Sequence, residues 1–93
     1  MLAQIPIDLK KVKAGDIDKE ILRLAMIAEL DAVNLYEQMA SLTDNNDMKK
    51  ILLDVAKEEK THVGEFQALL LKHDKEQVKE LEEGKKEVEK ELE

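Results

Sequence analysis

The sequence has 93 residues, with 15 lysines and arginines against 22 aspartates and glutamates, and its formal net charge is −7. This length limits it to one domain with a small core, and the acidic balance argues against nucleic acid as a partner, because nucleic-acid binding requires a basic surface. The sequence contains no cysteine and no apolar run long enough to span a membrane, which excludes disulfide frameworks and rubredoxin-type iron sites and favours a soluble intracellular protein.

The chain begins with a mixed segment, residues 1–15, in which Pro6 interrupts the apolar pattern. We expect this lead-in segment to be extended or to form a short helix that packs on a neighbour. The first long helix is predicted for 17–42, because this stretch contains neither glycine nor proline and is rich in alanine, leucine, methionine and glutamate. Asp16 is a suitable N-cap for this helix.

A polar turn rich in capping residues follows at 43–47, and a second long helix is predicted for 47–72. Asp74 and Gln77 form a capping-box pattern, which predicts a third helix over 75–91. The apolar positions of the third helix are sparse, and the remainder is mainly lysine and glutamate. Two interpretations of this helix stay open: a solvated surface arm, or a helix that docks against another subunit.

Two polar residues interrupt the apolar face of the second helix. Apolar side chains recur there at steps of three and four residues, and Glu59 and His62 lie on the same face. Glutamate is seldom buried unless it is paired or bound to a metal. A Glu-x-x-His pair points both side chains the same way, as in the carboxylate di-iron proteins built on four-helix bundles. The two residues are therefore candidate metal ligands, and a purely structural helix pair is the alternative.

A polar residue, Glu29, also interrupts the apolar face of the first helix. Helices joined by a short turn run antiparallel. Glu29 precedes the turn by about 16 residues, and Glu59 and His62 follow it by about 15 and 18, so all three lie at a similar height along the helices. We therefore expect them to meet, unless Glu29 is a core glutamate that is buried and hydrogen-bonded.

One such hairpin supplies two carboxylates and one imidazole, which is half the ligand set of a carboxylate di-iron site. A two-fold homodimer would present each residue twice and would complete a four-helix bundle around its axis. Oxygen ligands with one imidazole per ion suit iron or manganese. The sequence thus predicts an all-α fold, in which an antiparallel helical hairpin and a C-terminal helix form a ferritin-like bundle by dimerisation.

Two segments, AELDAVNLYEQMA at 28–40 and AKEEKTHVGEF at 56–66, resemble the encapsulated ferritin-like proteins. The resemblance implies a ferroxidase centre with two iron ions, completed across a dimer interface, whose ligands match three residues here: Glu29, Glu59 and His62. It also places Tyr36, two turns after Glu29, beside that centre. For Tyr36, a core position with a bonded hydroxyl and a redox role are both open.

This resemblance implies a cytoplasmic protein that oxidises Fe(II) to Fe(III) for storage inside an encapsulin nanocompartment. The implied partners are the encapsulin shell protein and further copies of the chain, in a ring of dimers such as a homodecamer, with no nucleic acid and no membrane. Two rival functions remain: a structural oligomerisation module of a shell protein, and a peroxidase of the rubrerythrin kind, which the absence of cysteine disfavours.

The sequence departs from the family pattern in two places. Some members carry an outer pair of acidic residues that guides iron towards the centre; Asp31 retains the second of these, whereas Ala28 replaces the first. Cargo members also end in a short shell-targeting peptide, and no such peptide precedes Glu93. We therefore expect a trimmed chain, a domain cut from a fusion, or another route into the shell.

Overall fold

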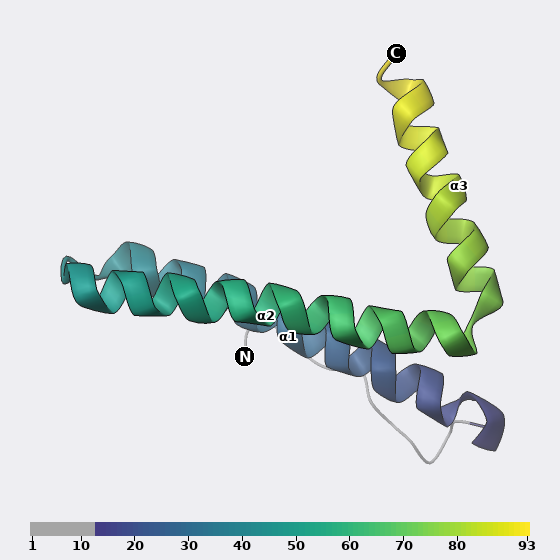
Figure 1. Cartoon of the computed structure of the whole chain (residues 1–93), viewed down its shortest axis with the longest axis horizontal. Helices are drawn as coiled ribbons and strands as arrows, with labels where there is room; N and C mark the ends of the chain where they lie inside the picture. Colours follow the sequence, from purple (N-terminus) through teal and green to yellow (C-terminus); the bar gives the residue numbers. More distant parts are fainter. Residues whose placement is uncertain (1–12) are drawn as a thin grey trace.

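The computed structural model describes residues 13–93 and contains three α-helices and no strand in that range (Figure 1). A 3-10 turn, η2 (Ala14–Asp16), leads into α1 (Ile17–Leu42), which is followed by α2 (Asn46–His73) and α3 (Lys75–Glu91). The predicted all-α fold is confirmed, and every helix begins and ends within one residue of its predicted position. Residues 1–12 of the predicted lead-in segment lie outside the described residues.

The two long helices begin in different ways. The Asn45 side chain accepts a hydrogen bond of 3.0 Å from the backbone N–H of Met48, so that α2 begins one residue earlier than predicted. Asp16 occupies the N-cap position of α1, but its side chain makes no capping hydrogen bond. Its backbone N–H donates instead to the carbonyl of Lys13, at 2.9 Å, which closes the 3-10 turn. The predicted helix boundary at Asp16 is therefore correct, and the predicted capping role of its side chain is wrong.

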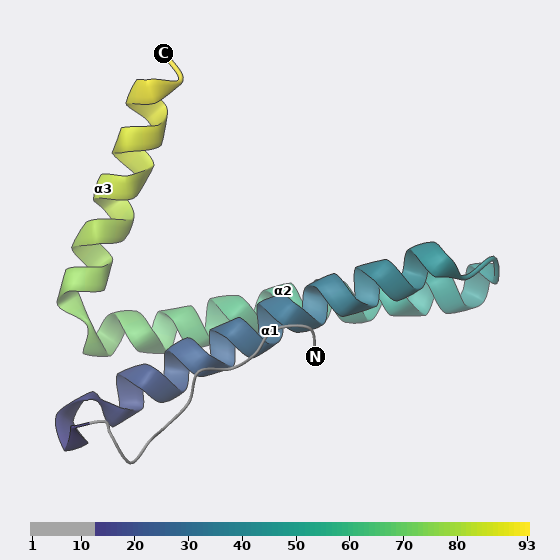
Figure 2. The same cartoon turned by 180° about the vertical axis from the view of Figure 1, so that it is seen from behind.

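Helices α1 and α2 lie side by side and antiparallel, as the two opposite views show (Figures 1 and 2). Among the described residues, only four apolar side chains are buried: Val33, Ala40, Ala56 and Leu70. Two of these are alanines, whose small side chains allow the helix axes to approach closely. Many large apolar side chains elsewhere on the hairpin stay exposed. Two helices alone cannot enclose a core, so the hairpin offers considerable apolar surface to a partner.

Helix α3 leaves the end of the hairpin at a steep angle, which gives the molecule the shape of an L (Figure 1). The extents of the molecule along its principal axes are 47 × 44 × 20 Å. A single residue, Asp74, separates α2 from α3, with φ −135° and ψ 89°. The Arg23 guanidinium donates to Asp74 Oδ2 at 2.9 Å, and the backbone N–H of Gln77 donates to Oδ1 at 3.0 Å. Asp74 therefore caps α3 and also ties the corner to α1.

These contacts make the corner sensitive to pH. The hydrogen bond from the Gln77 backbone, with a smaller contribution from Arg23, lowers the pKa of the Asp74 carboxyl below its ordinary value. A carboxyl whose pKa is lower in the folded state stabilises the fold above its unfolded pKa, near 4, and loses that contribution as the pH falls through the lowered value. The corner should thus be tight at neutral pH and should loosen in acid.

The Asp74→Ala variant tests the role of this carboxylate, because it removes both the cap of α3 and the ion pair with Arg23. We expect it to broaden the range of α3 orientations at neutral pH, whereas Asp74→Asn, which can still cap, should broaden it less. The chain has no native cysteine, so spin labels can be placed at Gln38→Cys and Lys90→Cys and diluted with unlabelled protein. An unchanged distance distribution in Asp74→Ala would show that the corner does not depend on this carboxylate.

Candidate metal centre

The hairpin brings together the three polar residues that interrupt its apolar faces. His62 Nδ1 lies 3.4 Å from Glu29 Oε2 and 3.4 Å from Glu59 Oε2. Glu29 comes from the middle of α1, and the other two residues come from successive turns of α2. One donor atom from each residue lies within 4.8 Å of the other two. The predicted meeting of these residues at one height is therefore observed.

Glu29 carries an unusual oxygen atom. Its Oε2 is buried and has no hydrogen-bond partner in the part of the chain that the structure describes. His62 Nδ1 is close, at 3.4 Å, but the contact does not have hydrogen-bond geometry. Buried polar atoms are nearly always satisfied, because an unsatisfied one costs of the order of 1–3 kcal/mol. A cation at this point would satisfy Glu29 Oε2, so the atom itself indicates a ligand.

The donor set suits a transition-metal ion. It combines two carboxylates with one imidazole, and this mixture fits iron or manganese better than an all-oxygen set would. Metal–ligand bonds to such groups are about 2.0–2.2 Å long, so donor atoms around one ion lie no more than about 4 Å apart. The observed separations of up to 4.8 Å would therefore close by small side-chain rotations.

The three side chains lie at the surface of the hairpin, where another chain could reach them. Exposed fractions are 41% for the His62 side chain, 20% for Glu29 and 18% for Glu59. Two exposed apolar residues of α2, Ile51 and Leu69, share the side of the helix on which His62 lies. An ion bound here would have only three protein ligand groups from one chain. The open side of the cluster is thus the side on which a second copy could add more.

Two further residues named from the sequence lie outside this cluster. Tyr36 is half-buried, and its hydroxyl makes no hydrogen bond within residues 13–93. Asp31 is 6% exposed and has a polar interaction of its own, and its position two residues after Glu29 points it to the far side of α1. The structure therefore does not bring Asp31 to the three-residue cluster. None of the helices within residues 13–93 is long and apolar enough to cross a bilayer.

Comparison with known proteins assigns the chain to one family. The sequence profile of the rubrerythrin family matches residues 20–93. In Pyrococcus furiosus, a ferritin-like–encapsulin shell fusion protein is 68% identical over 69 residues, which are 74% of this chain and 20% of the fusion. The encapsulin nanocompartment cargo protein EncC of Myxococcus xanthus is 46% identical over 56 residues, or 60% of this chain and 43% of EncC. The chain thus spans less than half the length of either relative.

A solved structure covers almost the whole chain. The encapsulated ferritin domain from Pyrococcus furiosus superposes with a TM-score of 0.82 and 55% sequence identity, over 97% of this chain and 94% of that domain. This likeness supports the ferritin-like fold that the helical hairpin indicates. Together with the profile match, it shows that the chain belongs to the rubrerythrin family and has the fold of an encapsulated ferritin domain.

Proposed function

We propose that two copies of this chain form a ferroxidase centre, with Fe(II) as the substrate and Glu29, Glu59 and His62 as its ligands. The observation that carries the proposal is the convergence of these three donors around the unsatisfied Glu29 Oε2. Two copies related by a two-fold axis would supply four carboxylates and two imidazoles. Four carboxylates balance the charge of two divalent ions, so such a site would be close to neutral when filled.

Each residue has a distinct task in this proposal. Glu59 would bridge the two ions, and Glu29 and His62 would complete the coordination of each. Two Fe(II) ions held close together can each give up one electron, so the pair can supply two electrons to an oxidant such as O₂. Carboxylates favour the more highly charged Fe(III), which lowers the free energy of the oxidised product. His62, at 41% exposed in one copy, lies on the side that the second copy would cover.

We further propose that the chain works with an encapsulin shell, inside which the Fe(III) product mineralises. The support is that two relatives are, by name, an encapsulin shell fusion protein and an encapsulin cargo protein. The L-shaped chain is thin, with extents of 47 × 44 × 20 Å, which leaves little room for mineral inside one copy. Coexpression with the shell protein should yield particles that contain this chain and accumulate electron-dense iron; empty particles would contradict the partnership.

The direct test of the activity is aerobic Fe(II) oxidation, followed by ultraviolet absorbance. A ferroxidase should form Fe(III) faster than the uncatalysed reaction, at a rate proportional to protein. Family membership gives one alternative, a peroxidase, and the same assay with hydrogen peroxide under anaerobic conditions separates it from an O₂-dependent enzyme. A purely structural module would leave both rates at the uncatalysed level.

The Tyr36→Phe variant tests the tyrosine of α1 that lies two turns after Glu29 and that the family resemblance assigns to the surroundings of the centre. We expect normal folding and an oxidation rate that falls by less than about tenfold, because a residue that transfers protons usually contributes about 10²–10⁴-fold. The matched measurement is metal binding by calorimetry with Co(II), which should not change. A complete loss of oxidation with intact metal binding would instead assign Tyr36 a redox or proton-transfer role.

A further inference from the structure

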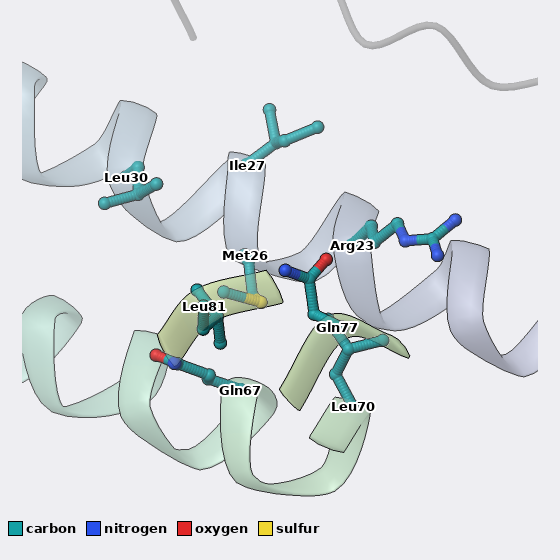
Figure 3. Close-up of a pocket in the computed structure, with 8 residues that line it drawn as sticks. All are labelled: Arg23, Met26, Ile27, Leu30, Gln67, Leu70, Gln77 and Leu81. Carbon is teal, nitrogen blue, oxygen red and sulfur yellow. The ribbon is translucent and has the colours of Figure 1, made fainter. Parts of the chain in front are cut away.

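Little apolar packing fixes the contact between α1 and α2 around the candidate metal centre. Within residues 13–93, only four apolar side chains are buried, and two of them are alanines. At the corner, residues of all three helices line a hollow of about 430 Å³, among them Met26, Leu30 and Leu70 (Figure 3). Met26 lies one turn before Glu29 in α1, and Leu30 follows Glu29 directly. The position of Glu29 relative to α2 must therefore depend on other contacts as well.

An ion pair joins the two helices beside the candidate centre. Lys60 Nζ of α2 lies 3.2 Å from Glu37 Oε2 of α1. Lys60 directly follows Glu59 and is turned from it by about 100° around α2, whereas Glu37 is turned from Glu29 by about 80° around α1. Because the helices are antiparallel, these two rotations lead to the same flank of the contact. The ion pair thus closes one flank of the hairpin next to the cluster.

His62 lies towards the opposite flank. It follows Glu59 by three residues, which turns it by about 60° in the other sense around α2. Its side chain is 41% exposed, on the open side where a second copy could add ligands. Lys60 and Glu37 therefore lie behind the cluster. From there they can influence the positions of the ligands without binding a metal ion themselves.

The ion pair also runs along the helix axes. Glu37 precedes Asn45 by about 8 residues and Lys60 follows it by about 15, so their Cα atoms differ in height by about 10 Å. Side chains on a helix lean towards its N-terminus, so Lys60 leans towards the turn and Glu37 leans away from it. The two charged groups meet between these heights. An extended pair of this kind opposes sliding of α2 along α1 as well as rotation of α2.

The candidate centre tolerates little movement of either sort. Its donor atoms lie up to 4.8 Å apart, and they must approach to about 4 Å around one ion. A slide of α2 by one residue would move Glu59 and His62 by about 1.5 Å relative to Glu29. This movement is larger than the gap that has to close. A contact that fixes α2 at Lys60 therefore acts on metal binding through Glu59.

We propose that Glu37 and Lys60 are positioning residues of the metal centre, and that their ion pair holds the turn of α2 that carries Glu59 against Glu29. The inference rests on the metal site of the proposed function, but not on its reaction. The side chains of Lys60 and Glu37 are 60% and 46% exposed. Exposed ion pairs contribute modestly, because solvent screens them. The expected effect is thus a severalfold change in metal affinity rather than its loss.

The test is Co(II) binding by the Lys60→Met variant, measured by calorimetry and by the absorption bands of the ion. Methionine keeps much of the length of the lysine side chain and removes its charge. Loss of a cation beside the site would by itself strengthen the binding of Co(II). A positioning role predicts the opposite sign, with a Kd that rises about three- to fivefold. A Kd that is unchanged or lower would overturn the proposal.

Matched variants separate the pair from the charge. Lys57→Met removes a cation from the same helix, and Lys57 has no ion-pair partner within residues 13–93, so its Kd should not rise. Lys60→Arg keeps the ion pair and should bind Co(II) as the wild type does. The exchanged pair Glu37→Lys/Lys60→Glu keeps both charges and their combined length, so it should bind Co(II) more tightly than Glu37→Lys alone. No such restoration would show that the two residues do not act as a pair.

Fe(II) oxidation distinguishes this inference from the proposed function. If the wild type binds Co(II) but does not oxidise Fe(II), the ferroxidase proposal fails, and a raised Kd in Lys60→Met still supports the positioning role. If the wild type oxidises Fe(II) and Lys60→Met equals it in both rate and Co(II) affinity, the ferroxidase proposal stands and the positioning role is wrong. Helix content by circular dichroism should be the same in every variant, which excludes unfolding as the cause.

Discussion

Alanine in place of Glu59 should slow Fe(II) oxidation by more than about a hundredfold, since changes in the surroundings of metal ligands alone already cost about 10–100-fold. Glu59 is the proposed bridging ligand, so its loss affects both ions at once. Two-fold symmetry doubles the effect, because each substitution removes two carboxylates from one centre. Glu29→Ala and His62→Ala should also slow the reaction strongly.

Matched variants show whether such losses are specific. Glu20→Ala removes an exposed glutamate of α1 on the side away from Glu29, and His73→Ala removes the other histidine of the chain. Both should oxidise Fe(II) at close to the wild-type rate. Helix content by circular dichroism should be unchanged in all five variants, which separates loss of ligands from loss of fold.

The outcome that would contradict the assignment is a normal rate in a folded Glu59→Ala or His62→Ala variant. Titration with Co(II) adds a second readout, because its absorption bands depend on the ligands. These bands should weaken or shift in the three ligand variants and stay unchanged in the two controls. Bands that are identical in wild type and Glu59→Ala would place metal binding elsewhere on the chain.

The helices and the cluster could be predicted because both depend on local periodicity. The starts of α2 and α3 follow from capping residues, and the extent of all three helices follows from apolar spacing; both signals act over a few residues. The meeting of Glu29 with Glu59 and His62 needs only one further assumption, that a short turn makes the helices antiparallel. Helix rise then fixes their common height. The observed 3.4 Å contacts agree with that simple geometry.

The corner and the buried Asp31 could not be predicted in the same way. The direction of α3 depends on the backbone of one residue, Asp74, and on an ion pair with Arg23, which is 51 positions away. Neither the backbone angles of Asp74 nor this ion pair produces a periodic pattern in the sequence. Asp31 belongs to the polar side of α1 by its spacing, yet it is 6% exposed. Its spacing along α1 gives no sign of that burial.

The second large effect expected is on assembly, because metal binding and dimerisation should be coupled. In a dimer without metal, the proposed centre would gather four carboxylates beside exposed apolar residues such as Ile51 and Leu69. Bringing such charges together without partners is costly. Each ion removes that repulsion and adds bonds that reach from one copy to the other. Binding that occurs only in the dimer must favour the dimer by mass action.

The size of this shift can be estimated. At a free metal concentration of about a hundred times Kd, each bound ion stabilises the dimer by about 2.7 kcal/mol, or about a hundredfold in the association constant. Two ions should therefore lower the dimer Kd of the metal-centre interface by several orders of magnitude. Fe(II) under anaerobic conditions, Co(II) or Zn(II) should each raise the molar mass, and chelator should reverse the change.

Light scattering on size exclusion, with metal and with chelator, measures this shift. Metal should convert monomer into dimer and larger assemblies of the wild-type chain. Adding Glu29→Gln and Glu59→Gln should abolish the response to metal, while removal of the charges should favour a metal-independent dimer, since glutamine keeps the shape of glutamate. A molar mass that changes with neither metal nor chelator would mean that apolar contacts alone join the copies. The ions would then bind without bridging the two chains, and Glu59 could not be the shared ligand.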